Sequence, residues 1–268
     1  MTTIEATQAQ VADLDDELRA GPAYWWRSYL LMVRWELYST RLELPLIVIV
    51  QLMVGAGMAI GFGFLFVDPQ GPQALFLATG ATVVPMMMVG LVILPQAIAQ
   101  QKIAGTYQYL FGLPVPRMAM YFAGLTVWTI VALPSSIVAL LVAAWRYDLD
   151  LSIDPLVVPA MLLAIAVAAA IGYAFAHGLP NPRLTHVLTQ LLVFVLVLFS
   201  PINFPADRLP DWLQAIHEWL PPQHAATAVR ATLTEGLIEE DLGRSFAVLG
   251  GWTVVSWLFT AWVMERRR

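Results

Sequence analysis

Six long runs of apolar residues recur along this 268-residue chain, and shorter polar stretches separate them. A helix needs about 20 apolar residues to cross the hydrocarbon core of a bilayer, and each run approaches or exceeds that length. We therefore expect membrane-spanning helices at residues 45–67, 73–99, 118–144, 155–176, 184–200 and 245–264. The pattern predicts an all-α integral membrane protein, with one six-span domain over residues 45–268.

The composition narrows the class of protein. Hydrophobic residues make up 59% of the chain and charged residues only 12%, whereas soluble domains are about 25% charged. A water-soluble enzyme is thereby excluded, and the net charge of −5 argues against a nucleic-acid partner. The expected spans contain no Asp, Glu, Lys or Arg. Ion-coupled transporters and intramembrane enzymes place ionisable groups at that depth, so both classes are disfavoured.

Basic residues predict the orientation of the chain. With six spans both termini lie on one side, together with residues 100–117 and 177–183. These segments contain ten of the fourteen Lys and Arg residues. Because cytoplasmic segments carry the excess of positive charge, both termini are expected in the cytoplasm. Residues 1–21 are polar and acidic, and we expect a disordered tail there.

Residues 22–44 predict an amphipathic helix before the first span. Arg27, Arg34 and Arg41 are seven residues apart, so they fall within about 40° of one another on a helix. Tryptophan and other apolar side chains occupy the remaining faces. This pattern favours a helix lying in the cytoplasmic membrane interface, next to membrane lipid. The alternative is a surface helix packed on other protein.

The loop at residues 100–117 is unusually apolar for a cytoplasmic connection. Its large side chains are Tyr107, Tyr109, Leu110, Phe111 and Leu113. They would suit docking into a cleft of another protein, or they could dip into the membrane interface. Two glycines, at positions 105 and 112, bracket a short helical piece. Two prolines, at 114 and 116, predict an extended exit into the third span.

Residues 201–236, between the last two spans, form the other unusual segment. Trp212, Ile216 and Trp219 recur there at helical spacing. A second short helix is expected from Ala225 to Leu233, with Gly236 as its stop. We therefore predict two short helices at or partly within the outer leaflet.

These two segments resemble motifs of the type 2 ABC exporter permeases, and the daunorubicin-resistance type most of all. The loop motif corresponds to Gly105, Thr106, Leu110, Pro114 and Arg117. The outer motif corresponds to Ser200, Pro201, Phe204, Pro205, Leu209, Pro210, Trp212, Leu213, Pro222, Arg230, Leu233 and Gly236. The chain departs from the family pattern where acidic residues are usual, since glutamines stand at positions 101 and 108.

The resemblance implies a bacterial cytoplasmic-membrane exporter of a hydrophobic or amphipathic molecule, such as a drug, an antibiotic or a lipid-like compound. It implies a second permease subunit, identical or a sister chain, and a separate ABC ATPase that carries ATP and Mg²⁺. No cofactor is expected on this chain, because its one lysine, Lys102, has no phosphate-binding loop before it. The ATPase-coupling residues would be Gln101, Lys102, Gly105, Thr106, Tyr107, Tyr109, Leu110, Pro114 and Arg117.

Other readings stay open at this level. A permease that exports polysaccharide or lipid-linked glycan is the main alternative, and an intramembrane enzyme is a distant one. Gly57 and Gly61 form a pair that allows close helix approach, either between subunits or within one chain. Residues that could line a cargo cavity are Gln51, Met86, Met87, Gln190 and Asn203.

Overall fold

The computed structural model describes residues 21–65, 71–149, 151–233 and 241–266. Its regular structure within these ranges is helical. The elements are α2 (Pro22–Thr40), α3 (Leu44–Leu65), α4 (Pro72–Met88), η1 (Val89–Ile93), α5 (Leu94–Ile103), α6 (Thr106–Phe111), α7 (Arg117–Tyr147), α8 (Val157–Gly178), α9 (Pro182–Phe194), η2 (Val195–Phe199), η3 (Ala206–Arg208), α10 (Asp211–His217), α11 (Pro221–Ala231) and α12 (Leu242–Arg266). The expected acidic tail at residues 1–21 lies almost wholly outside the described residues.

Six helices are long and apolar enough to cross a membrane, which confirms the expected number of spans. They are Leu44–Phe64, Pro72–Ile103, Arg117–Tyr147, Val157–Gly178, Pro182–Phe199 and Leu242–Arg266. Where both ends are described, they agree with the predicted ends to within about one helical turn. The second span is continuous from α4 through η1 to α5, where η1 is a short π-helical segment.

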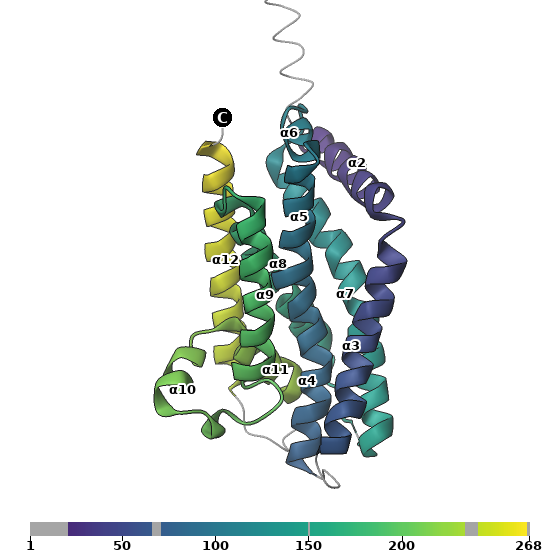
Figure 1. Ribbon diagram of the computed structural model, residues 1–268, viewed down its shortest axis with the longest axis vertical. Helices are drawn as coiled ribbons and strands as arrows, with labels where there is room; N and C mark the ends of the chain where they lie inside the picture. Colours follow the sequence, from purple (N-terminus) through teal and green to yellow (C-terminus); the bar gives the residue numbers. More distant parts are fainter. Residues whose placement is uncertain (1–20, 66–70, 150, 234–240, 267–268) are drawn as a thin grey trace, which may run out of the picture.

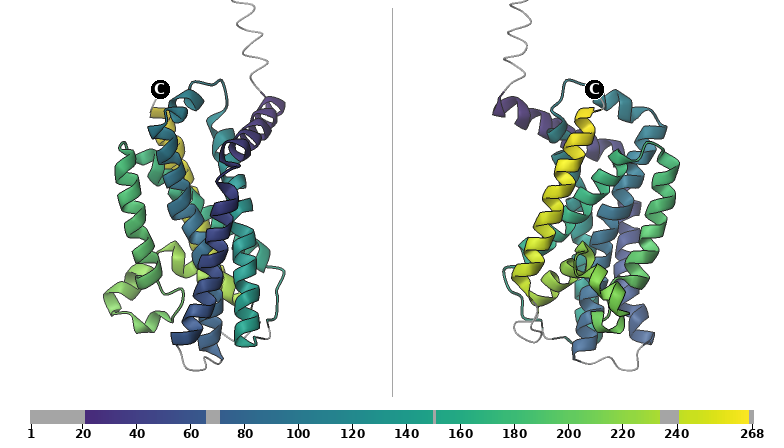
Figure 2. Two further views of the ribbon diagram at one scale, coloured as in Figure 1. Left: turned by 45° about the vertical axis from the view of Figure 1, so that its right-hand side comes forward. Right: turned by 90° about the vertical axis from the view of Figure 1, so that its left-hand side faces the viewer.

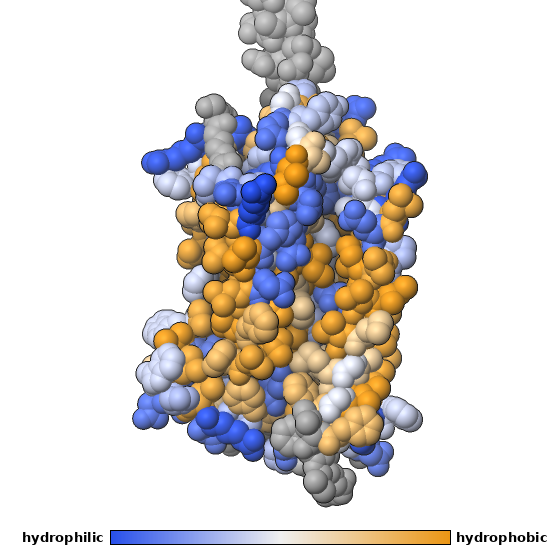
Figure 3. Space-filling view, viewed as in Figure 1, coloured by the Kyte–Doolittle hydropathy of each residue, from blue (hydrophilic) through white to orange (hydrophobic). Residues whose placement is uncertain are grey.

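The spans form an upright bundle with different structures at its two ends (Figure 1). Helix α6, helix α2 and the end of α12 lie at one end, and α10 lies at the other (Figures 1 and 2). We call these the α6 end and the α10 end. A band of apolar side chains crosses the middle of the face in Figure 3, with polar side chains toward both ends. This distribution matches a protein whose middle is surrounded by lipid.

The second span is the centre of the bundle. Almost all of its side chains are buried, and α4 contacts α3, α7, α8 and α11. By contrast, α3, α9 and α12 leave most of their side chains outside the core. The interior of one chain is therefore filled with side chains, and the surfaces left for lipid or for another subunit belong to these peripheral helices.

Backbones of the second and fourth spans touch where η1 crosses α8. A Cβ atom added to Gly90 would lie 2.4 Å from the carbonyl carbon of Ala168, and one added to Gly172 would lie 2.0 Å from the Gly90 oxygen. Only glycine permits this approach. In α3, a Cβ atom at Gly57 or Gly61 would meet nothing within 4 Å. Packing within the chain therefore does not account for that pair.

Candidate functional site

Helix α6 forms a short turn at the end of the bundle. The chain enters it at Gly105, whose φ of 79° is left-handed and suits glycine. The helix ends before Gly112, so the expected helical piece between the two glycines is confirmed. Pro116 then adopts φ −57° and ψ 125° immediately before α7. This extended residue is the exit that the prolines predicted.

The large side chains of this loop divide between two environments. Tyr107 and Leu110 are buried within the chain, whereas Tyr109 is 66% exposed. Ile103, at the end of α5, is 60% exposed beside it. Of the five large side chains expected to meet another protein, Tyr109 is thus the most available. The buried pair instead seats α6 on the bundle.

Two cations flank α6, Lys102 near the end of α5 and Arg117 at the start of α7, and Lys102 lies over the Tyr107 ring of α6. The Nζ atom of Lys102 donates hydrogen bonds to the carbonyl oxygens of Ala176 and Leu179, at 2.5 and 2.9 Å. These carbonyls lie at the end of α8, where helices leave oxygen atoms without partners in the helix. The Arg117 guanidinium lies over the Phe111 ring at 5.4 Å. Both cations, which we expected to serve coupling, thus contact aromatic rings of α6.

The other coupling candidates surround the same helix. Pro114 is exposed, and its carbonyl oxygen accepts a hydrogen bond from the Tyr24 hydroxyl of α2. Thr106, the first residue of α6, is partly buried. Gln101 lines a cavity between α6 and the bundle, which is described below. The loop is therefore in contact with α2, α5 and α8.

A continuous row of rings extends from α6 into the bundle. Tyr107 lies 5.7 Å from His177, and His177 stacks on Tyr173 at 5.6 Å between ring centroids. Tyr173 in turn lies 4.8 Å from Tyr121 of α7. Each pair is within the range in which aromatic rings attract one another. The row joins α6 to the interior through side chains of α8 and α7.

A cavity of about 60 Å³ lies beside this row and contains a carboxylate. We name it the Glu36 cavity, after its charged residue on α2, and its walls include Tyr121, Trp128 and Tyr173. Burial raises the pKa of the Glu36 carboxyl from 4.5 to about 7, and a hydrogen bond from Trp128 opposes that rise. Sequence reasoning missed Glu36. The available signal was its position nine residues after Arg27, about 180° around the helix from the arginines.

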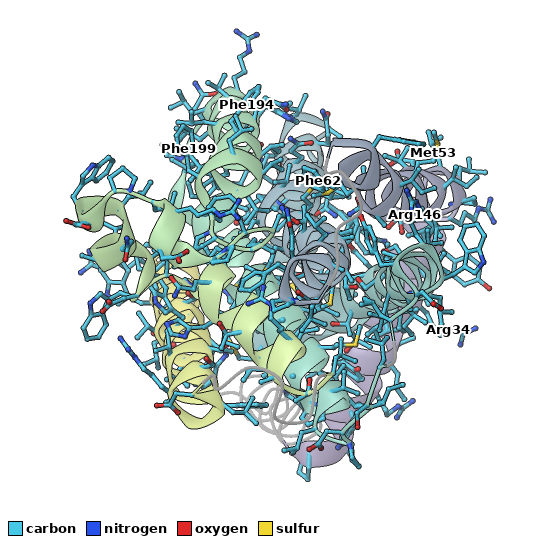
Figure 4. All side chains as sticks on the ribbon, turned by 90° about the horizontal axis from the view of Figure 1, so that it is seen from below. Arg34, Met53, Phe62, Arg146, Phe194 and Phe199 are labelled. Atoms are coloured by element: carbon cyan, nitrogen blue, oxygen red, sulfur yellow. The ribbon has the colours of Figure 1, made fainter. Side chains whose placement is uncertain are left out.

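Helix α2 uses opposite faces for different surroundings. The face with Glu36 packs on α7, where the hydroxyls of Tyr29 and Thr126 are 2.8 Å apart and Trp25 meets Phe122 edge-on. The three arginines expected on one face, Arg27, Arg34 and Arg41, are all exposed. Figure 4 shows Arg34 at the edge of the bundle. The helix thus packs on protein and also presents a basic face outward.

The segment at the α10 end has the two expected short helices, but their placement differs from the prediction. Helix α11 begins at Pro221, four residues earlier than expected, because proline suits the first turn of a helix. It lies among α4, α8 and α12 with most of its side chains buried. The expected stop at Gly236 lies outside the described residues. Prolines that break the segment include Pro201, which is buried, and Pro205 and Pro210, which precede η3 and α10.

Arg230 anchors α11 to the second span. It is only 1% exposed. Its Nε atom donates to Thr79 Oγ1 at 3.1 Å, and a terminal nitrogen donates to the Ile202 carbonyl at 2.9 Å. The guanidinium also lies 3.7 Å from the centroid of the Phe76 ring. Arg230, one of the expected motif residues, is therefore a structural link between α11 and α4.

The residues expected to line one cargo cavity lie apart. Met86 and Met87 are fully buried in the core, and Gln51 donates to the Pro85 carbonyl at 3.3 Å. Gln190 is exposed on α9. Asn203 alone lines an open cleft, of about 290 Å³, at the α10 end. The sequence of an apolar span does not indicate which of its faces points into the bundle, so it could not distinguish core, surface and cleft positions.

The remaining motif residues complete this end. Phe204 lines the same cleft as Asn203, and Trp212 projects from α10 with 66% of its surface exposed. Pro222 lies in the first turn of α11. Among the described residues, no group of three or more His, Asp or Glu side chains is placed to hold a metal ion.

Six apolar helices and a lipid-compatible surface define a multi-pass membrane protein. Comparison with protein families identifies which kind. The model of the ABC-2 type transporter family matches residues 23–234, which is most of the chain, and the protein belongs to that family. Members are transmembrane components of transporters without a catalytic role, and they generally work with an ABC ATPase. A search of curated proteins found no match.

Proposed function

We propose that the chain is the permease subunit of an ATP-driven exporter in the bacterial cytoplasmic membrane. The cargo would be hydrophobic or amphipathic, as for permeases of the daunorubicin-resistance type. The α6 end would face the cytoplasm, because it bears the excess of Lys and Arg residues. Energy would come from a separate ATPase that binds ATP and Mg²⁺.

The observation that supports this proposal is the combination of anchored and exposed side chains in and beside α6. The helix is seated by Tyr107 and Leu110, and the Tyr107 ring contacts His177 of α8, so a force on it reaches the bundle. At the same time Tyr109 and Ile103 remain exposed for contact with another protein. An exposed apolar patch on a well-anchored element is the expected design of a contact that transmits movement.

The cargo path would lie between two permease chains. The centre of one chain is closed by the buried second span and by the contact of Gly90 with Gly172. Helix α3 instead presents Gly57, Gly61 and Met53 outward, and Met53 is visible at the edge of the bundle in Figure 4. Small residues in an exposed apolar helix favour close association with a second membrane helix.

The test is ATP hydrolysis by the purified permease–ATPase complex in liposomes. Tyr109→Asp places a charge in the proposed contact, and we expect it to lower cargo-stimulated hydrolysis by about tenfold or more. Trp212→Asp is the matched control, because Trp212 is equally exposed, at 66%, but lies at the opposite end. Full stimulation in the Tyr109 variant, with the complex intact, would refute coupling through α6.

A further inference from the structure

The Glu36 cavity combines a carboxylate with aromatic walls. Its acidic side chain comes from α2, while Tyr121 and Trp128 come from α7 and Tyr173 from α8. Of the described residues that line it, Glu36 is the acidic one, and none is Lys or Arg. Aromatic faces attract cations, and the attraction is strongest where water is excluded. Such walls around a carboxylate are a chemical environment for a positively charged group.

Two basic side chains near α6, Lys102 and Arg117, do not line this cavity. Lys102 donates to the end of α8 and lies over the Tyr107 ring, and Arg117 lies over Phe111. Burial raises the pKa of the Glu36 carboxyl to about 7, because the ionised form loses the compensation that water would give it. A bound cation would supply that compensation.

The size of the cavity limits what can enter. About 60 Å³ is room for an ammonium group or about four water molecules, but not for a whole drug-sized molecule. A second cleft of about 440 Å³ adjoins it, and Met264 lines both. Trp25 and Met118 give this cleft apolar walls, and the charged residues Arg117 and Glu265 lie at its border. A molecule with a charged head and an apolar body would therefore find a place for each part.

We propose that the Glu36 cavity binds the protonated amine of an amphipathic organic cation, with Glu36 as counter-ion and the rings of Tyr121, Trp128 and Tyr173 around it. The inference rests on the proposed export function and adds a charge requirement to its cargo. An exported amine and the ethanolamine headgroup of a lipid share this chemistry. In either case the occupant lies against Tyr173, which the row of rings joins through His177 to Tyr107 of α6.

The experiment compares two fluorescent probes on the purified permease in detergent. Dansylcadaverine has an apolar ring system and a protonated amine, and its N-acetyl derivative is the same molecule without the charge. We expect the wild-type chain to prefer the amine by about tenfold in Kd, as a partly desolvated ion pair with aromatic walls would give. Glu36→Gln should remove the preference, and Glu36→Asp should keep part of it.

Glu43→Gln is the matched control, because Glu43 is an exposed acidic residue one turn beyond the end of α2. It should leave the preference unchanged. Thermal unfolding of each variant establishes that it is folded. Equal affinity of the wild type for both probes, or an undiminished preference in Glu36→Gln, would overturn the proposal. Addition of phosphatidylethanolamine to phosphatidylglycerol nanodiscs distinguishes the sources, since only a lipid occupant competes with the probe.

Failure of this site and failure of the export function are distinguishable. ATP-dependent uptake of either probe by inverted vesicles containing the complex tests export, whichever of the two probes is preferred. If uptake occurs while Glu36→Gln binds amines as the wild type does, the site is wrong and the exporter stands. If no probe is transported while the variants still differ in amine binding, the site stands and the export function fails.

Discussion

The contact between Gly90 and Gly172 gives the sharpest prediction about the bundle. A Cβ atom at Gly90 would lie 2.4 to 2.5 Å from three atoms of Ala168 and Ala169, two of which belong to the backbone. Ordinary contacts are about 1 Å longer. Backbone atoms cannot turn aside as a flexible side chain can, so Gly90→Ala must push η1 away from α8.

The loss of folding stability caused by Gly90→Ala can be estimated from this overlap. Overpacking of a core costs about 1–3 kcal/mol, and the backbone contact places this substitution near the upper limit. A loss of about 3 kcal/mol in a chain of this size lowers Tm by about 6–12 °C. Gly172→Ala should act in the same direction, because its Cβ would lie 2.0 Å from the Gly90 oxygen.

The assay is thermal unfolding of the purified permease in detergent, followed by tryptophan fluorescence. Gly251→Ala in α12 is the control, because a Cβ atom there meets nothing within 4 Å. Its Tm should be unchanged or slightly raised, since alanine favours helix over glycine. If Gly90→Ala melts within about 2 °C of the wild type, the close approach of the two helices is wrong.

Three further predictions concern charged side chains. Arg230→Met removes two hydrogen bonds from a charged group and the contact with Phe76, and should destabilise the chain by about 2 kcal/mol in the same melting assay. Lys102→Met leaves two carbonyls at the end of α8 without their donor, so limited proteolysis should cleave the α6 loop faster than in the wild type. Because the pKa of Glu36 is raised from 4.5 to about 7, the native state retains a proton that the unfolded chain releases between these values. Stability should therefore fall as pH rises from 4.5 to 7, and Glu36→Gln should reduce that fall; an identical pH slope in both proteins would contradict the assignment. The cavity is also lined by other titratable side chains, which are the same in the wild type and in Glu36→Gln: Tyr107, Tyr121, Tyr173 and His177.

The spans and α6 could be predicted because their signals are local. An apolar run of sufficient length reports a spanning helix wherever it occurs, and the spacing of Gly105 and Gly112 limits the helix between them. The predicted start of α11, at Ala225, is four residues too late, because Pro221 and Pro222 occupy its first turn.

The orientation of side chains depended on tertiary contacts that no local pattern contains. Tyr107 and Tyr109 are both aromatic and two residues apart, yet one faces α8 and the other the surface. Glu36 could be placed on the face opposite the arginines, but its cavity also requires Trp128 from α7 and Tyr173 from α8. In spans that are apolar on every face, the sequence does not indicate which residues, such as Met86, are buried in the protein core.

The hydrogen bond between Arg230 and Thr79 connects α11 to the second span, whose other end leads into α6. The 32 residues from Pro72 to Ile103 form a rod about 48 Å long, with Arg230 near one tip and α6 joined to the other. The π-helical segment and Pro95 lie between the tips, where helices bend most readily. Displacement of α6 would thus tilt the second span about its middle, and α11 would move with the far end of that span.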